Sequence, residues 1–288
     1  MTSALVPGSW LIVVGVDLDS AEVARLALGH GDDPNALLAL HGWHVLRVRD
    51  VLRHPVDRQV LTMTFVVVPS LRQPQKIEPL TSQVQSRPGA DLVGQAIPEG
   101  DAPEGEVALR HQRIAAYAVV TSSRGFLMTQ FSERTGAEGQ WGLPGGGLEA
   151  EEAPDRAVLR EVWEESGQVI EVSDLALIAT SRWVGVAPGG HLEDYHAVRV
   201  VYRAVCPEPT EPVVHDVGDT TASATWLLPA DLDLLALTPG WRSILRDVTR
   251  LGVGGADVSD VVMAPDETDC PDHRQHDPDA DDRARPQP

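Results

Sequence analysis

The sequence predicts an α/β protein with a mixed β-sheet. Short apolar, β-branched runs typical of buried strands are interspersed with segments of helical periodicity. A segment rich in Pro, Gln, Ser and Gly divides the chain into two units, and the last residues are almost without apolar side chains. We therefore predict a small α/β unit over residues 1–70, a linker over 71–110, a larger α/β unit over 111–252 and a disordered acidic tail over 253–288.

Composition excludes several classes of partner. The chain of 288 residues carries 43 acidic and 23 basic residues, a formal net charge of -20, which repels phosphate backbones and anionic lipids. The N-terminus has no basic region before its short apolar run, and no apolar stretch approaches membrane-spanning length. The two cysteines, Cys206 and Cys270, have neither disulfide-framework nor zinc-site spacing. We expect a cytoplasmic protein that binds neither nucleic acid polymers nor membranes.

The first unit is expected to alternate strands and helices. Residues 10–16 form a β-branched run that predicts a buried strand, and Ser20 then predicts the N-cap of a helix over 21–28. A short helix over Asn35–Leu40 and a strand pair over 44–52 and 59–68 follow. Binding, dimerisation into a homodimer and control of specificity all remain open as roles for this unit.

The second unit begins with a predicted hairpin. Its strands cover 113–121 and 126–132, joined by a turn at Ser123–Gly125. Further strands are predicted over 174–180, 197–205 and 224–228, and a helix over 241–251. This order of elements predicts a mixed sheet covered by at least two helices.

An acidic segment between the hairpin and the next strand predicts a metal site. The turn at Gly145–Gly147 leads to a helix expected over Glu152–Ser166 and ended by Gly167. Glu161 and Glu165 repel each other across one helical turn by about 0.2–0.5 kcal/mol, and acids in the last turn oppose the helix dipole by about 0.3–1 kcal/mol each. A divalent cation removes this conflict, because carboxylate oxygens are the ligands that Mg²⁺ or Mn²⁺ prefers.

The same segment resembles the Nudix box of the Nudix hydrolases. Gly146 is followed after five residues by Glu152 and, after seven more, by the run from Arg160 to Gly167, which reads REVWEESG. The departure from the pattern is Gln168, where the family usually has an aliphatic residue. The resemblance covers about residues 113–252 and implies a Nudix-type α/β/α sandwich. It also implies a hydrolase, a pyrophosphatase that cleaves a nucleoside diphosphate linked to another moiety.

The resemblance also implies roles for individual residues. Metal ligands would be the side chains of Glu161, Glu164 and Glu165 with the backbone carbonyl of Gly146, and one of these acids or a loop acid would serve as the base. Arg160 would orient the loop and helix by pairing with Glu152. The remaining candidate residues belong to a nucleoside pocket or supply one further acid. The candidates for the pocket are Arg113, Tyr117 and Trp141. The candidate for the further acid is Asp216 or Asp219.

Other interpretations of these residues stay open. A run of acids is often a solvated helix face, and a Nudix domain can also be a non-catalytic, nucleotide-sensing regulator. Aromatic residues such as Tyr117 and Trp141 are more often core residues. The acids Glu193 and Asp194 are expected to be solvated, and His196 to be a packed strand residue. The substrate could be ADP-ribose or a nucleotide sugar, an oxidised nucleoside triphosphate, or a dinucleoside polyphosphate.

Overall fold

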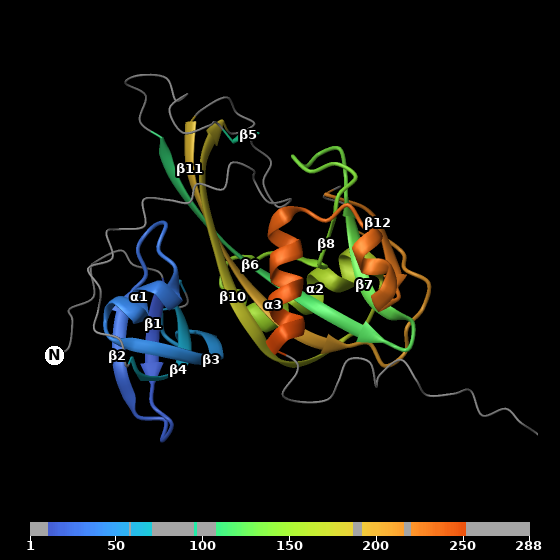
Figure 1. Ribbon diagram of the computed structural model, residues 1–288. Helices are drawn as coiled ribbons and strands as arrows, with labels where there is room; N and C mark the ends of the chain where they lie inside the picture. The colour runs from blue at the N-terminus through green and yellow to red at the C-terminus, as the bar shows by residue number, and fades with distance from the viewer. Residues whose placement is uncertain are drawn as a thin grey trace, which may run out of the picture.

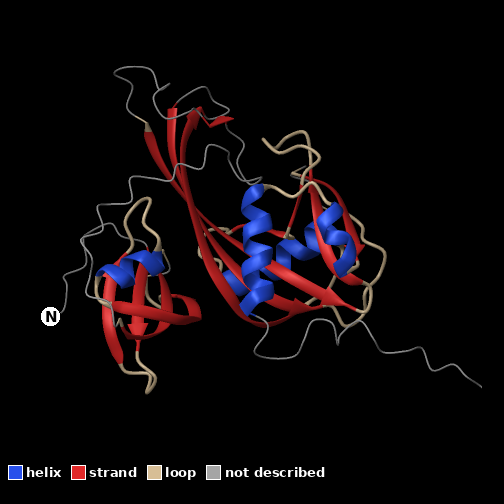
Figure 2. Cartoon of the chain, in the orientation of Figure 1, coloured by secondary structure: helices blue, strands red, loops and turns tan. Residues whose placement is uncertain are grey.

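The computed structural model describes residues 11–57, 59–70, 95–96, 108–186, 192–215 and 220–251. It contains two β-sheets with few helices (Figures 1 and 2). The predicted linker lies largely outside the described residues, and the predicted tail lies wholly outside them. None of the described helices is long and apolar enough to cross a membrane.

The N-terminal sheet has four strands in the order β2-β1-β4-β3. Strand β1 is parallel to β4, and the other two neighbouring pairs are antiparallel. The predicted helix over Asn35–Leu40 and the predicted strand pair are confirmed. Asp33 caps the helix by accepting the backbone N–H of Ala36 at 2.9 Å. The elements are β1 (Leu11–Val16), β2 (Glu22–Ala27), α1 (Pro34–Leu40), β3 (Trp43–Arg53) and β4 (Leu61–Pro69).

The predicted helix over 21–28 is wrong, because this segment is strand β2. The Asp17 side chain accepts the backbone N–H groups of Asp19 and Ala21 at 3.0 and 2.9 Å, and Ser20 takes a left-handed conformation with φ 68°. Ser20 is therefore a turn residue and not an N-cap. The turn reverses the chain, so that β2 forms its backbone hydrogen bonds with the buried strand β1 and the tertiary pairing overrides local helix propensity.

The large sheet confirms the predicted mixed topology. Its strands run in the order β12-β7-β6-β11-β10-β5, with β8 paired to β7 and β9 paired to β6. Strands β6 and β11 are parallel, and β6–β7, β7–β12 and β10–β11 are antiparallel. The strands are β5 (Gln95–Ala96), β6 (Leu109–Ser122), β7 (Gly125–Phe131), β8 (Trp141–Gly142), β9 (Gly145–Gly147), β10 (Glu171–Val186), β11 (Leu192–Val205) and β12 (Thr221–Leu227).

Two helices cover opposite faces of this sheet, which confirms the α/β/α sandwich. Side chains alternate along β6: Ala116 and Ala118 share a core with Val158 and Val162 of α2 (Pro154–Ser166), whereas Tyr117 packs on the other face with α3 (Pro239–Leu251). A short 3₁₀ helix, η1 (Pro229–Leu234), precedes α3.

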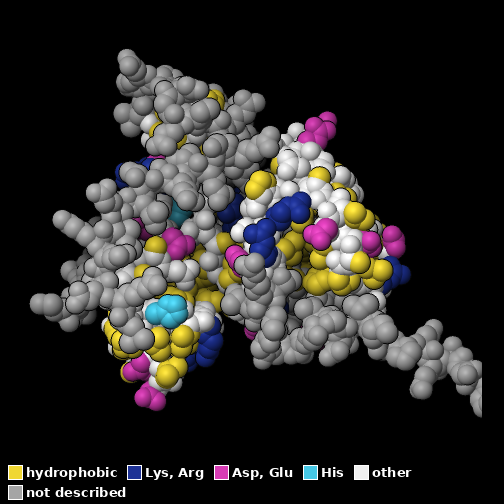
Figure 3. Space-filling view, viewed as in Figure 1, with side chains coloured by type: hydrophobic (Ala, Val, Ile, Leu, Met, Phe, Trp, Pro, Cys, Tyr) yellow, Lys and Arg dark blue, Asp and Glu magenta, His cyan; other side chains and the backbone are white. Residues whose placement is uncertain are grey.

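Helix α3 is amphipathic. Its buried face contributes Trp241 and Ile244 to the core, whereas Arg242 and Arg246 are exposed on the opposite face. Basic side chains gather over this helix in the space-filling view (Figure 3). This division lets one helix cover the sheet and keep its charged groups in water.

The N-terminal unit is joined to the large sheet by buried polar contacts. Thr180 of β10 donates to the Asp33 carboxylate at 2.8 Å, and His30 Nε2 lies 3.2 Å from Asp194 Oδ1. Asp194 also accepts two hydrogen bonds from Arg182, both at 2.6 Å. The expectation that Asp194 is solvated is therefore wrong, because it is 6% exposed at this contact. One core cluster contains apolar side chains of both units.

His196 is a packed strand residue at the same contact, as predicted. It lies in β11 and is completely buried. Its Nδ1 atom is 2.8 Å from the Gln112 amide nitrogen, and its ring meets that of His30 edge to face at 5.5 Å between centroids. Burial, with a smaller effect from the neighbouring His30, lowers the pKa of His196 to about 4.

We expect His196 to make the fold sensitive to acid. An unfolded histidine has a pKa of about 6.5, so the unfolded chain takes up this proton first as the pH falls from 6.5 to 4. From pH 7.5 to 5 the free energy of unfolding should fall by about 2 kcal/mol through this group alone. Urea unfolding at both pH values should show a smaller decrease in the free energy of unfolding for His196→Gln than for the wild type. The exposed-site control, His54→Gln, should keep the full loss; equal losses in all three proteins would contradict the assignment.

Candidate functional site

The acidic segment forms a strand, a loop and a helix. Strand β9 pairs with β6, so Gly146 lies opposite Ala116. Helix α2 begins at Pro154 and ends at Ser166, two residues shorter at its N-terminus than predicted. Gly167 has φ 69° and donates its N–H to the Trp163 carbonyl at 2.8 Å. Pro at the first helical position and a left-handed Gly at the end set the helix limits.

Arg160 is the centre of the hydrogen-bond network on this helix. Its Nε and Nη2 atoms donate to the two oxygens of the Glu152 carboxylate at 2.9 and 2.8 Å, as the resemblance implied. Nη2 also donates to the Gly147 carbonyl at 3.1 Å. Nη1 donates to Glu161 and to Glu164, each at 3.0 Å. One guanidinium group thus ties the loop to two acids of the helix.

The network shifts the pKa values of its members in opposite directions. Hydrogen bonds from Arg160 lower the pKa of Glu152, and the Glu152 carboxylate in turn raises the pKa of Arg160. Burial raises the pKa of Glu161, although Arg160 opposes this rise. Burial therefore disfavours the negative charge of Glu161, whereas the guanidinium groups of Arg160 and Arg113 favour it.

Glu165 has different partners. Its side chain accepts the backbone N–H of Gly145 at 2.8 Å and the hydroxyl of Thr221 at 2.6 Å, and the residue is 5% exposed. The structure thus brings Glu161 and Glu164 together on Arg160 and turns Glu165 toward β9 and β12. In the described part of the chain, no three acidic, His or Cys side chains form a ready-made metal cluster.

Gly146 brings the backbone of β9 against the Glu161 carboxylate. A Cβ atom at this position would lie 2.5 Å from Glu161 Cδ, so any larger residue would displace the acid. At the neighbouring Gly147 a Cβ atom would lie 2.9 Å from Arg113 Nη2. Arg113, predicted to bind substrate, is therefore beside the box, and its charge acts on the Glu161 pKa.

The two aromatic candidates lie on the other side of β6 and β7. Tyr117 is 2% exposed and packs edge to face on Trp241, with 4.5 Å between ring centroids. Trp141 is partly buried against the same cluster. Tyr117 is thus a core residue of the α3 side. Asp216 and Asp219, the candidates for a further acid, lie outside the described residues.

Gln168, the departure from the box pattern, anchors a loop. Its amide nitrogen donates to the Ser166 carbonyl at 3.1 Å and to the Thr210 hydroxyl at 3.0 Å. Its carbonyl oxygen accepts the backbone N–H of Thr210 at 3.0 Å. The same loop continues to His215, whose N–H binds the Glu164 carbonyl at 2.7 Å. The loop therefore satisfies backbone carbonyls at the end of α2.

Two polar contacts of the site were not predicted from the sequence. Thr221 binds Glu165, and Arg53 of the N-terminal sheet binds the backbone carbonyl of Glu152. Thr221 lies in a run of threonines with no distinguishing spacing, and Arg53 is 99 residues from its partner. Neither position carried a local signal.

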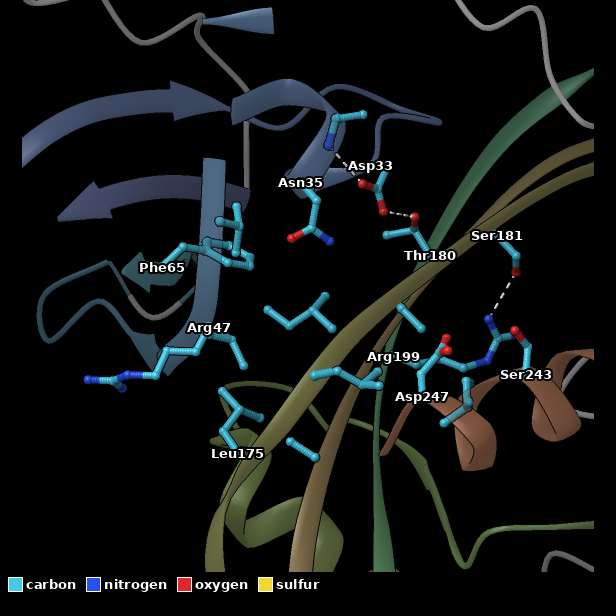
Figure 4. A pocket seen from close by; sticks show the side chains of 18 of the residues that line it. Asp33, Asn35, Arg47, Phe65, Leu175, Thr180, Ser181, Arg199, Ser243 and Asp247 are labelled. Carbon is cyan, nitrogen blue, oxygen red and sulfur yellow. Dashed lines mark hydrogen bonds between the residues drawn. The ribbon is translucent and has the colours of Figure 1, made fainter. Parts of the chain in front are cut away.

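Two hollows lie between the N-terminal unit and the large sheet. The smaller, of about 550 Å³, borders the box loop and is lined by Arg53, Gln59, Gln112, Ile114, Ala150 and Glu151. The larger cleft, of about 1630 Å³, lies between α1, β3, β10 and α3 (Figure 4). At its wall Arg199 donates to Ser181 at 2.9 Å. The acids of the box do not line this larger cleft.

Comparison with known proteins finds matches to the part of the chain that holds the site. Residues 111–248 match the NUDIX domain, which confirms the resemblance for this part of the chain. A MutT-like protein from Streptomyces ambofaciens is 33% identical over 99 residues, which are 34% of this chain and 54% of that protein. The chain thus spans about half the length of the curated relative that it matches.

Solved structures with similarity to the chain include two MutT proteins. The protein from Methanosarcina mazei is 22% identical with a TM-score of 0.40, covering 49% of this chain and 95% of its own. The MutT NUDIX hydrolase from Burkholderia pseudomallei is 28% identical with a TM-score of 0.37, covering 48% and 99%.

We expect Gln168→Leu to destabilise the fold, although an aliphatic residue is usual at this position of the box. The substitution removes the hydrogen bonds between the buried Gln168 side chain and Thr210, and a hydrogen bond contributes about 0.5–1.5 kcal/mol to stability. Chemical denaturation should show this loss in the free energy of unfolding. Gln59→Leu, at an exposed glutamine, is the control and should change it little; equal effects of the two substitutions would refute the anchoring role.

Proposed function

Because residues 111–248 form a NUDIX domain, we propose that the protein hydrolyses a pyrophosphate bond in a nucleoside diphosphate linked to another moiety. The observation that carries this proposal is the Arg160 network, in which Glu152, Glu161 and Glu164 are ordered around one guanidinium group.

The residues present fit a divalent cation. Glu161, Glu164 and Glu165 with the Gly146 carbonyl supply hard oxygen donors, which suit Mg²⁺ or Mn²⁺. The raised pKa of the partly buried Glu161 marks a carboxylate that a cation would stabilise. A bound metal would neutralise phosphate charge and ease deprotonation of water.

The protein's own groups have separate tasks in this proposal. Arg160 and Glu152 hold the loop and helix in register, and one of the box carboxylates accepts the proton of the attacking water. The positive charge of Arg113 beside Glu161 suits a substrate phosphate. Trp141 would line the nucleoside pocket. Tyr117 would support that pocket from within the core. Asp216 or Asp219 would supply the further acid.

A non-catalytic domain that senses nucleotides is the alternative. A panel of ADP-ribose, nucleotide sugars, oxidised nucleoside triphosphates and dinucleoside polyphosphates distinguishes the two, with released AMP, GMP, phosphate and pyrophosphate quantified. Turnover supports the hydrolase, whereas tight binding without turnover supports the regulator.

We also propose a cytoplasmic location for the protein. In this proposal residues 1–70 are a separate unit joined to the second unit by the linker 71–110, and residues 253–288 are a dispensable tail.

We expect turnover to depend on millimolar Mg²⁺ or Mn²⁺. The oxygen donors of the box are acidic, so activity should disappear with excess EDTA and return when the metal is restored in excess over the chelator. The rate of product release measures both steps. Undiminished turnover in EDTA would contradict the assigned chemistry.

We expect Glu161→Gln to reduce kcat by about 10²-fold or more, because it removes a charged group at the reacting centre. The matched control is Asp155→Asn on the same helix. Asp155 is exposed in the first turn, where it interacts favourably with the dipole by about 0.3–1 kcal/mol. Asp155→Asn should therefore lower stability slightly and leave kcat unchanged. Wild-type kcat for Glu161→Gln on every cleaved substrate would show that the box is only a scaffold.

A further inference from the structure

A side chain of the N-terminal sheet reaches the loop of the box. Arg53 is the last residue of β3, and its Nε atom donates a hydrogen bond to the backbone carbonyl of Glu152. Glu152 immediately precedes Ala153, which occupies the N-cap position of helix α2. The contact therefore fixes the backbone at the point where the loop becomes the helix.

Glu152 links this contact to the acids of the box. Its carboxylate accepts the Glu149 N–H at 2.9 Å and both bonds from Arg160. Arg160 in turn holds Glu161 and Glu164. A shift of the Glu152 backbone would thus move its carboxylate, and with it the guanidinium group that orients the two acids.

The loop is held in a conformation that it would not favour alone. Glu151 has φ 61°, a left-handed conformation that costs a residue with a side chain about 1–2 kcal/mol. Such strain persists only where the surroundings impose it. Arg53 and Gln59 of the N-terminal unit line the hollow of about 550 Å³ next to Ala150 and Glu151, so this unit forms one wall around the strained loop.

The attachment of the N-terminal unit does not depend on Arg53. Thr180 and Asp33 form one separate hydrogen bond, and His30 Nε2 lies 3.2 Å from Asp194 Oδ1. The two sheets also share a core cluster of apolar residues. Removal of the Arg53 side chain should therefore leave the two units docked and affect only the loop backbone at Glu152.

We propose that Arg53 is a positioning residue of the Nudix box, through which the N-terminal unit holds the loop that orders Arg160 and its acids. The inference rests on the proposed function for its effect on rate. In this proposal the N-terminal sheet contributes to the geometry of the hydrolytic site through Arg53.

Arg53→Gln, Arg53→Lys and Arg49→Gln test the proposal in the full chain. Arg49 lies on the same strand and interacts with Asp50 at 3.7 Å, away from the box. Arg53→Gln should lower kcat about tenfold with little change in KM, because small misplacements of reacting groups cost rate. Arg53→Lys retains a charged donor and should recover part of the loss. Arg49→Gln should match the wild type.

Hydrogen exchange of the loop amides at residues 148–153 gives a readout that does not require turnover. In Arg53→Gln these amides should exchange about tenfold faster, with the melting temperature unchanged and with exchange in β1 and β4 unchanged. A wild-type protein that cleaves no substrate would refute the proposed function, and loop exchange would still decide the role of Arg53. Wild-type loop exchange in Arg53→Gln, or a loss of protection spread over the whole chain, would overturn the positioning role.

Discussion

The geometry of the candidate site depends on the charge of Arg160. Acids three or four residues apart on one helix repel each other, and the last turn of the helix disfavours negative charge. A single guanidinium group offsets this by binding Glu161 and Glu164, and its remaining donors bind Glu152 and the Gly147 carbonyl. Because guanidinium is planar with several fixed donors, it orders the loop and the helix at once.

The large sheet provides the frame that brings this network together. Small residues on one face of β6, Ala116 and Ala118, allow α2 to pack closely, while Gly146 of β9 places backbone directly against Glu161. The opposite face receives α3 through Tyr117 and Trp241. Close packing on both faces makes β6 a rigid support for the acids.

Polar contacts define how the N-terminal unit meets this frame. Buried charges are unfavourable unless they are paired with good geometry, and Asp194 satisfies this requirement by binding Arg182 and His30 together. His196 remains neutral beside them. Because a different docking angle would separate His30 from Asp194 and Asp33 from Thr180, the contact favours one relative placement, which brings Arg53 to Glu152.

The sequence by itself determined the features that have a local period. The spacing from Gly146 to Gly167 predicted the helix and its end, and the resemblance to the Nudix box implied the pairing of Arg160 with Glu152. Apolar, β-branched patterns predicted several strands of both sheets. Only the tertiary structure decided that residues 22–27 form a strand, that Asp194 is buried, and that Glu165 binds Gly145 and Thr221. Backbone geometry repeats every few residues and leaves a pattern in sequence, whereas contacts between distant segments depend on how whole elements pack and leave none.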